Sequence, residues 1–421
     1  MSRRRRILRR VRLFWRALGP GLITGASDDD PSAITTYSQA GARYGLSTLW
    51  MAIFAYPVLA VLQETCARIG IVTGKGLTGV VKSHYPKWVL YLLIALSCPA
   101  FLCNMGADIA ILGDVGHLLL PSVPALYCSM VLTSFLFVLM WLLPYKKLMG
   151  TMKFVCLVLL VYAIVPFLTS QDGGSIIRHS LLPSFHMSKG FFLIIIGLIG
   201  AIISPYIFFW QTSSEVDALS VSMAAGNVAG EKNLLIARKD ILAGAFFAVL
   251  IMYFVILTTG TILNAHHIYS INTVRDAAMA LRPLGGDLSY FLFSAGVIAT
   301  GFLIIPVLSA SISFIITEAF DKKSGFNESP GEVRLFYFVI AIAMILGIAM
   351  HWLGFDSVKV LLFTTTLYGF ISPFVIALVL HIANNKKVMG PYSNNRGSNL
   401  TGSIALLVML GTLIGFVCSA L

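Results

Sequence analysis

The sequence predicts an all-α protein that crosses a membrane many times, and three observations support this fold class. Of its 421 residues, 57% are hydrophobic and 11% are charged, whereas ordinary soluble domains have about 25% charged residues. Apolar stretches of about 20 residues, the length that a helix needs to span a bilayer, recur along the chain. The first and the sixth of these stretches each carry a proline within the apolar run, which predicts broken or kinked helices. We expect one polytopic domain over 1–421, without a separate soluble domain.

Hydropathy predicts about eleven spans. We place them near 17–40, 46–71, 88–119, 123–143, 148–169, 190–212, 238–263, 287–317, 333–353, 357–383 and 399–420. The expected layout has a basic N-terminus at 1–16, a first five-span repeat at 17–169, a second at 190–383, and an additional span at 399–420.

Basic residues gather in alternate loops, which sets the expected orientation. The positive-inside rule explains the net charge of +12 and places these loops in the cytoplasm of a plasma-membrane protein. The N-terminus is then cytoplasmic and the C-terminus extracellular, and no nucleic-acid partner is expected. The loop residues concerned are Arg68, Lys75, Lys82, Lys87, Lys146, Lys147, Lys232, Arg238, Lys239, Lys322, Lys323, Arg334, Lys386, Lys387 and Arg396.

The first span contains three consecutive carboxylates, Asp28, Asp29 and Asp30, followed by Pro31. Ionisable groups within a bilayer cost several kcal/mol each, so they indicate a functional site. The proline should break the helix and free backbone carbonyls, which are tolerated only where they line a protein or water cavity. Carboxylate and carbonyl oxygens together are ligands that hard divalent cations prefer.

The sixth span repeats this feature, because Ser204-Pro205 lies within an apolar run. Two interrupted segments, each opening a set of five spans, predict inverted repeats with a binding site near the bilayer midplane. The alternative is a pair of ordinary proline kinks, which membrane helices tolerate.

Several motifs together resemble the Nramp metal-ion transporters over nearly the whole chain. Gly19-Pro20-Gly21 and Asp30-Pro31-Ser32-Ala33 resemble that family's G-P-G and D-P-G-N segments. Further matches follow in the second span and its loop (67–77), the third span (107–110), and the tenth span with its exit loop (372–374 and 386–390). The resemblance implies the LeuT-like fold, with two inverted five-helix repeats, broken helices 1 and 6, and an eleventh span.

The departures from the family pattern are specific. Ala33 replaces an asparagine, Ser204 a methionine and Tyr206 a histidine, while Ile111 and Thr365 stand where a glutamate and a glutamine are usual. This pattern resembles the Nramp-related magnesium transporter (NRMT) branch. It implies transport of Mg²⁺ and Mn²⁺ without obligatory proton coupling, with the metal as substrate and no cofactor.

The expected ligands combine hard oxygen with extra space. Asp30 is the primary ligand, supported by the Ala201 carbonyl and Ser204, while Ala33 leaves room for a partly hydrated ion. Asp28 and Asp29 either shape the negative field of the cavity or are solvated at the break. Around them we expect residues that support or gate the site, namely Ser32, Pro31, Pro205, Tyr206, Thr365 and Asp108.

The predicted proton pathway is reduced. Tyr206 does not titrate near neutral pH and Ile111 carries no proton. Asp108 is either a remaining proton carrier or a packing acid paired with a neighbour such as Arg68 or a backbone donor. Glu215 and Asp217, just after the sixth span, either form an inner vestibule or cap a loop.

Two other functions are consistent with parts of the pattern. One is a proton-coupled manganese or iron importer, against which Ser204 and Ala33 argue. The other is a LeuT-like carrier of amino acids or other organic solutes, which the anionic run at 28–30 opposes. No nucleophile elbow or H-E-x-x-H motif indicates an enzyme. We expect a monomer in the bilayer without an obligatory protein partner.

Overall fold

The computed structural model describes residues 19–143, 145–160, 172–224, 231–265, 267–269, 271 and 287–420. The predicted basic segment 1–16 and the end of the fifth span, 161–169, lie outside these residues. The described residues form helices and no β-strand. The helices are α2 (Pro20–Asp28), α3 (Pro31–Tyr44), α4 (Trp50–Thr73), α5 (Leu77–His84), α6 (Lys87–Leu119), α7 (Ala125–Leu142), α8 (Tyr145–Cys156), η1 (Leu157–Leu159), α10 (Gly173–Leu181), α11 (Lys189–Ile202), α12 (Pro205–Ala224), α13 (Glu231–Ile262), α16 (Asp287–Ala319), α17 (Arg334–Trp352), α18 (Ser357–Asn384), α19 (Lys386–Met389), η3 (Gly390–Tyr392) and α20 (Arg396–Ala420).

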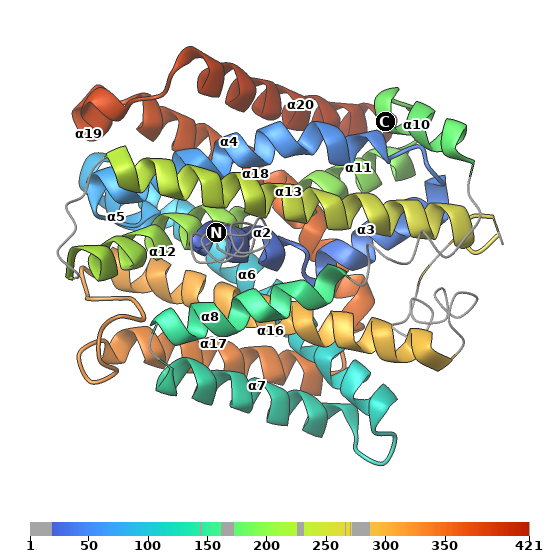
Figure 1. Cartoon of the computed structure of the whole chain (residues 1–421), viewed down its shortest axis with the longest axis horizontal. Coiled ribbons are helices and arrows are strands. Elements are labelled where there is room, and N and C mark those ends of the chain that lie inside the picture. The colour runs from blue at the N-terminus through green and yellow to red at the C-terminus, as the bar shows by residue number, and fades with distance from the viewer. Residues whose placement is uncertain are drawn as a thin grey trace, which may run out of the picture.

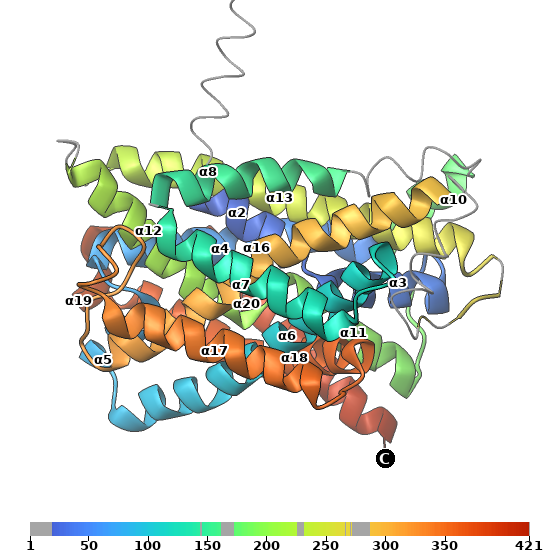
Figure 2. The ribbon, with the colours of Figure 1, turned by 90° about the horizontal axis from the view of Figure 1, so that it is seen from below.

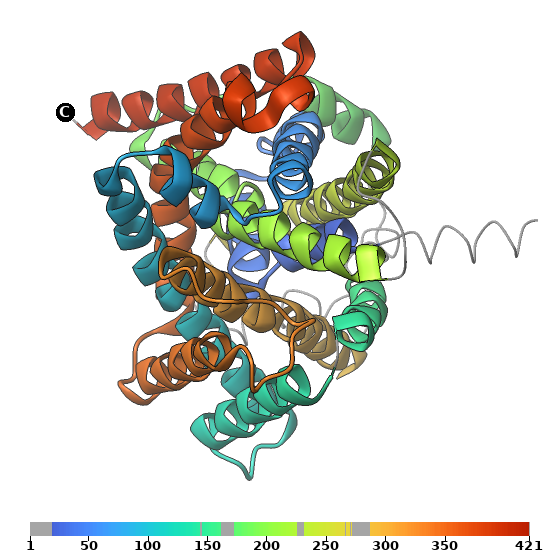
Figure 3. The ribbon, with the colours of Figure 1, turned by 90° about the vertical axis from the view of Figure 1, so that its left-hand side faces the viewer.

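The long helices lie side by side around a buried centre. In Figure 1, α20 forms one edge of the bundle and α7 and α17 form the opposite edge. Seen along the helices, α12 crosses the interior between these edges (Figure 3). The α11–α12 segment is largely buried, whereas α7, α17 and α20 expose most of their apolar surface. Outward-facing Val131, Ile345 and Leu407 are the kind of side chains that contact lipid.

Nine helical segments within the described residues are long and apolar enough to cross a membrane. The predicted first span is absent from this number because its halves, α2 and α3, have 9 and 14 residues. The predicted fifth span begins as α8 and continues into residues outside the described ranges. Two short helices, α5 and α10, form within segments that the hydropathy pattern treated as loops.

Both predicted helix breaks are present. Helix α2 ends at Asp28 and α3 begins at Pro31, with Asp30 in an extended conformation between them. Helix α11 ends at Ile202 and α12 begins at Pro205. In each case the proline is the first residue of the following helix, where its missing N–H costs nothing. The chain is therefore interrupted twice rather than merely kinked.

Basic loops from both halves of the chain meet at one end of the bundle, where α5 and α19 lie at the left of Figure 1. Lys82 of α5 pairs with Asp321 after α16. Arg68 of α4 donates to the Tyr392 carbonyl (3.2 Å) and to Asn394 Oδ1 (2.5 Å). Loops of like charge on one side are what the positive-inside rule describes.

The first half of the broken helix, α2, packs directly against α13, and Figure 2 shows it beside α13 and α8. Small residues make this contact: a Cβ on Gly25 would lie 2.2 Å from the Gly244 carbonyl oxygen, and one on Gly244 would lie 2.0 Å from that of Gly21. Asp240 of α13 accepts hydrogen bonds from the N–H groups of Gly21 (2.7 Å) and Leu22 (3.2 Å). A carboxylate thus caps the positive end of α2.

The close contact between α2 and α13 predicts that adding one methyl group at Gly244 destabilises the protein. Gly244→Ala should lower the free energy of unfolding by about 1–3 kcal/mol, because the new Cβ overlaps the backbone of α2. Thermal unfolding of the purified protein in detergent measures the change. Gly411→Ala in α20 is the matched control, since a Cβ there meets no atom within 4 Å and the replacement favours helix. Equal melting temperatures for the two variants would contradict the close packing of α2 on α13.

Candidate metal centre

The two prolines free one backbone carbonyl at each break. In an α-helix a carbonyl accepts from the N–H four residues later, and the residues four after Ser27 and Ala201 are Pro31 and Pro205, which have no N–H. The Ser27 carbonyl instead accepts from the Tyr206 hydroxyl (3.2 Å). The Ala201 carbonyl accepts from the Ser204 hydroxyl (2.9 Å). The two breaks therefore face each other, joined through Tyr206.

Asp30 is held rigidly at the start of α3. Its Oδ1 accepts from the Ser32 hydroxyl (2.5 Å) and from the Ala33 N–H (2.6 Å), which makes it the N-cap of that helix. Its Oδ2 accepts from Asn104 Nδ2 of α6 (3.0 Å). The side chain is 1% exposed. Ser32 and Ala33, both proposed from the sequence, thus orient this carboxylate through a hydroxyl and a backbone N–H.

Asp28 and Asp29 are fully buried, and none of their carboxylate oxygens has a hydrogen-bond partner among the described residues. Ser204 and Tyr206 lie beside Asp28, but Ser204 donates to Gly200 and Ala201, and Tyr206 donates to Ser27. Buried charges without partners are costly unless they are paired or coordinate a cation. Asp28 therefore leaves oxygen available where the two breaks meet.

Asn104 is a site residue that the sequence analysis missed. Its amide nitrogen donates to Asp30 and also to Asp108 Oδ2 (2.8 Å), while its oxygen accepts from the Thr364 hydroxyl (2.8 Å). Asn104 and Asp108 are four residues apart on α6 and so share a face. An amide one turn before an acid, within an apolar span, was the signal available in the sequence.

Asp108 has a different partner from the one proposed. Arg68 pairs with Glu64 (3.4 Å) and with the loop before α20, whereas Asp108 accepts from Asn104. The neighbour that pairs with Asp108 is therefore Asn104, one turn before it on α6, rather than Arg68 or a backbone donor, because Arg68 lies near the end of α4 and pairs with Glu64. The other oxygen of Asp108 is buried without a partner.

The hydrogen bonds of the Thr365 side chain go to α3 and α18. Its hydroxyl contacts that of Thr36 (3.0 Å) and donates to the Leu362 carbonyl (3.1 Å). It is buried on α18 against α3 and α11, where a Cβ on Gly200 would lie 2.0 Å from the Thr365 carbonyl oxygen. The residue thus belongs to the packing of α3 and α11 on α18.

The donors that converge on the two breaks are oxygen atoms: carboxylates, a hydroxyl and a carbonyl. Such ligands suit hard cations such as Mg²⁺, Ca²⁺ and Mn²⁺. No group of three or more His, Cys, Asp or Glu side chains within the described residues is arranged to hold a metal ion. Phe101 and Tyr368 pack against the Tyr206 ring, and Phe209 packs against Phe101.

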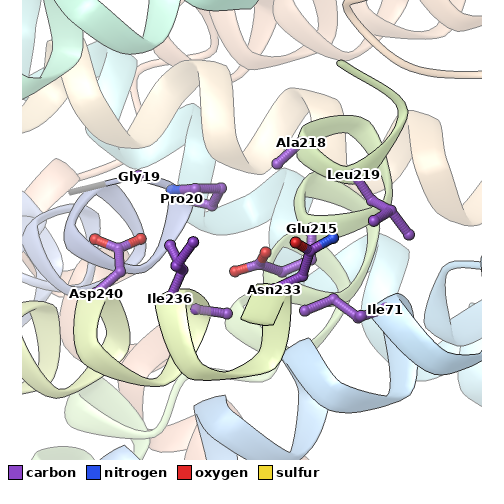
Figure 4. Close-up of a pocket in the computed structure, with 10 residues that line it drawn as sticks. Gly19, Pro20, Ile71, Glu215, Ala218, Leu219, Asn233, Ile236 and Asp240 are labelled. Atoms are coloured by element: carbon purple, nitrogen blue, oxygen red, sulfur yellow. The ribbon is translucent and has the colours of Figure 1, made fainter. Parts of the chain in front are cut away.

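A pocket of about 140 Å³ opens at the start of α2, at the end of the bundle where the basic loops meet (Figure 4). Glu215 and Asp240 line it together with Gly19 and Pro20. Eight residues of α2 separate Pro20 from Asp28, so the pocket lies about 12 Å along that helix from the break. Glu215 thus lines this pocket. Asp217 instead caps a loop, since its carboxylate accepts from the Phe326 N–H (3.0 Å).

Comparisons with known proteins agree over almost the entire chain. The family model described as "Natural resistance-associated macrophage protein-like" (Nramp) matches residues 21–419. A divalent metal cation transporter, MntH, from Caldanaerobacter subterraneus subsp. tengcongensis is 25% identical over 408 residues, covering 95% of this chain and 92% of that protein. MntH from Yersinia pestis is 22% identical over 416 residues, covering 97% and 95%.

Solved structures share the fold. The manganese transporter of Eremococcus coleocola superposes with a TM-score of 0.73 at 15% identity, covering 96% of this chain and 87% of that one. A nucleobase-cation-symport-1 family transporter superposes with a TM-score of 0.53 at 14% identity, covering 95% and 92%. The predicted fold class, an all-α LeuT-like membrane protein with broken helices 1 and 6, is confirmed.

Tyr206 and Tyr368 allow a matched test of the contact between the breaks. Both are fully buried, but the Tyr206 hydroxyl donates to Ser27 whereas the Tyr368 hydroxyl has no partner in the described structure. Tyr206→Phe should cost about 1 kcal/mol of unfolding free energy because it leaves the Ser27 carbonyl unpaired, and Tyr368→Phe should be neutral or stabilising. Thermal or denaturant unfolding of both variants measures this. A larger loss of unfolding free energy in Tyr368→Phe than in Tyr206→Phe would show that the Tyr206–Ser27 hydrogen bond does not stabilise the site.

Proposed function

This chain belongs to the Nramp family, and we propose that it imports Mg²⁺, together with Mn²⁺, by alternating access without obligatory proton coupling. The family consists of metal-ion transporters, so the protein is a divalent-metal transporter rather than an enzyme, and the metal is its substrate rather than a cofactor. The observation that carries the proposal is the meeting of two broken helices that offer only oxygen atoms to an ion.

The ligand chemistry supports a hard ion. Methionine sulfur favours soft transition metals, but Ser204 supplies a hydroxyl at the sixth-span break. The Ala33 N–H donates to the Asp30 carboxylate, and the methyl group of Ala33 occupies less space than a carboxamide would. Mg²⁺ gives up its water reluctantly and is usually bound through one or two carboxylates. Asp30 as primary ligand, with Asp28, Ser204 and the Ala201 carbonyl beside it, suits an ion that keeps part of its hydration shell.

The membrane potential supplies enough free energy for uncoupled import. One charge moving through 100 mV gains about 2.3 kcal/mol, so a divalent cation gains about 4.6 kcal/mol. This energy sustains a concentration ratio above about a thousandfold. Tyr206 is not a group that titrates near neutral pH, and Ile111 has no proton to carry. The proton pathway is therefore reduced to Asp108.

The alternative is proton-coupled import of Mn²⁺ or Fe²⁺. The names of the similar proteins, manganese transporter and divalent metal cation transporter, favour it, as does the buried Asp108 next to Asn104 and Asp30. A carrier of organic acids would need free helix N-termini facing a substrate carboxylate. The N-terminus of α3 is already capped by Asp30, so this alternative has less support.

For the arrangement in the membrane, we propose a monomer in the plasma membrane with a cytoplasmic N-terminus and an extracellular C-terminus. The basic loops share one end of the bundle, and the Glu215 pocket opens there, which suits release of a cation into the cytoplasm. The two five-helix repeats comprise residues 17–169 and 190–383, and 399–420 is the additional span. Asp29 is assigned to the negative field of the site.

Uptake by proteoliposomes with an imposed inside-negative potential tests the function. We expect Mg²⁺ and Mn²⁺ entry that rises with the potential, without acidification of the lumen reported by a trapped pH dye. Strict acidification with Mn²⁺ and no Mg²⁺ flux would establish the proton-coupled alternative instead.

Asp30→Ala in the same assay should abolish uptake while the protein remains folded. Asp172→Ala is the control, since Asp172 caps the loop helix α10 away from the breaks. Near-normal flux in Asp30→Ala would exclude Asp30 as a ligand.

Replacement of the hydroxyl at the second break should change the ion preference. Ser204→Met introduces a soft sulfur and is expected to move the preference toward Cd²⁺ or Mn²⁺ relative to Mg²⁺. Ser204→Ala, which removes the hydroxyl without adding sulfur, should weaken Mg²⁺ uptake without that change. Competition of each ion with Mg²⁺ uptake measures the order of ion preference. If Ser204→Met leaves this order unchanged, the Ser204 hydroxyl does not set the preference.

A further inference from the structure

We propose that Asn104 is a positioning residue that makes Asp30 bind the transported ion through a single oxygen, and thereby selects Mg²⁺ over Ca²⁺. The inference rests on the proposed function and extends it to α6, outside both broken helices. It concerns specificity, which the residues of the two breaks alone do not explain, because hard oxygen ligands accept both ions.

The orientation of the Asn104 amide follows from its surroundings. The amide nitrogen faces the carboxyl oxygens of Asp30 and Asp108, each of which can accept a hydrogen bond. It donates one hydrogen to Asp30 Oδ2 (3.0 Å) and the other to Asp108 Oδ2 (2.8 Å). The amide oxygen then faces Thr364 of α18, whose hydroxyl hydrogen is shared between this oxygen (2.8 Å) and the Leu361 carbonyl (2.9 Å). Asn104 and Thr364 are completely buried, so water does not compete for these bonds.

The hydrogen bonds leave Asp30 with one free acceptor position. A carboxylate has about four lone-pair sites, two on each oxygen. On Oδ1, the Ser32 hydroxyl and the Ala33 N–H use both. On Oδ2, Asn104 uses one, and one remains. A cation can therefore bind Asp30 through Oδ2 alone, and bidentate binding would require breaking the bonds that hold the carboxylate on α3.

One-oxygen binding affects the two ions differently. Ca²⁺ takes six to eight oxygen ligands in a flexible geometry and often uses both oxygens of one carboxylate. Mg²⁺ takes six in a near-ideal octahedron and usually keeps several waters. Restricting Asp30 to one contact removes a ligand that Ca²⁺ would use and removes nothing that Mg²⁺ needs. Asn104 thus acts through the geometry of Asp30 rather than by touching the ion.

Asn104→Leu tests the inference, because leucine has a similar volume and no donor. In the full chain, the affinity for Mg²⁺ should fall about 10- to 100-fold, as is typical when a partner of a metal ligand is removed. The affinity for Ca²⁺ should fall less or rise, so that the Ca²⁺-to-Mg²⁺ affinity ratio increases at least about tenfold. Isothermal titration of the purified protein with each metal alone gives both constants.

Thr364→Val keeps the amide but removes the bond that orients it, and should change the ratio in the same direction by a smaller factor. It also keeps the inference testable if Asn104→Leu does not fold. Thr133→Val is the matched control, because it removes a buried hydroxyl of α7 that has no partner in the described structure, and its ratio should equal that of the wild type.

A ratio that stays within twofold of the wild type in folded Asn104→Leu, or in Thr364→Val if the first variant does not fold, would overturn the inference. The ratio separates specificity from general loss of structure, since a smaller folded fraction lowers binding of both ions equally. If the wild type binds Mn²⁺ but not Mg²⁺, the proposed function fails, and the same comparison of Mn²⁺ with Ca²⁺ decides the role of Asn104.

Discussion

The structure depends on two prolines, each of which lacks the backbone N–H that would continue its helix. Pro31 and Pro205 cannot donate to the carbonyls of Ser27 and Ala201, so each helix stops and restarts within the apolar interior. Unpaired backbone groups are not tolerated in lipid. The two breaks must therefore lie in protein, where the Tyr206 hydroxyl satisfies the Ser27 carbonyl and the Ser204 hydroxyl satisfies the Ala201 carbonyl. The arrangement concentrates oxygen atoms at one place between the two halves of the fold.

Negative charge at the breaks is only partly compensated by the protein. Asp30 receives three hydrogen bonds, whereas the carboxylates of Asp28 and Asp29 have no partner among the described residues. Burying such groups costs free energy that a divalent cation would return. A site that is stabilised by its cargo, yet holds it through few direct ligands, can both bind an ion and release it. This balance is what a transporter needs.

The first halves of the two broken helices pack closely against different neighbours. Helix α2 contacts α13 through Gly21, Gly25 and Gly244, and α11 contacts α18 through Gly200 and Gly369. Glycine lets the backbones approach closely, and close packing makes each pair behave as a rigid unit. The breaks between these pairs have no helical hydrogen bonds to transmit rigidity. The two interruptions in helical hydrogen bonding therefore coincide with the proposed ion-binding residues.

The sequence by itself determined the membrane class, the positions of both breaks and the acidic run, because these follow from local rules. Apolar length predicts a span, and a proline acts on the carbonyl four residues before it. Only the tertiary structure decided which groups meet there. Asn104 lies 74 residues from Asp30, Thr364 lies 260 from Asn104, and Tyr206 lies 179 from Ser27. Contacts over such separations depend on how the helices pack against one another, and no local pattern specifies that packing.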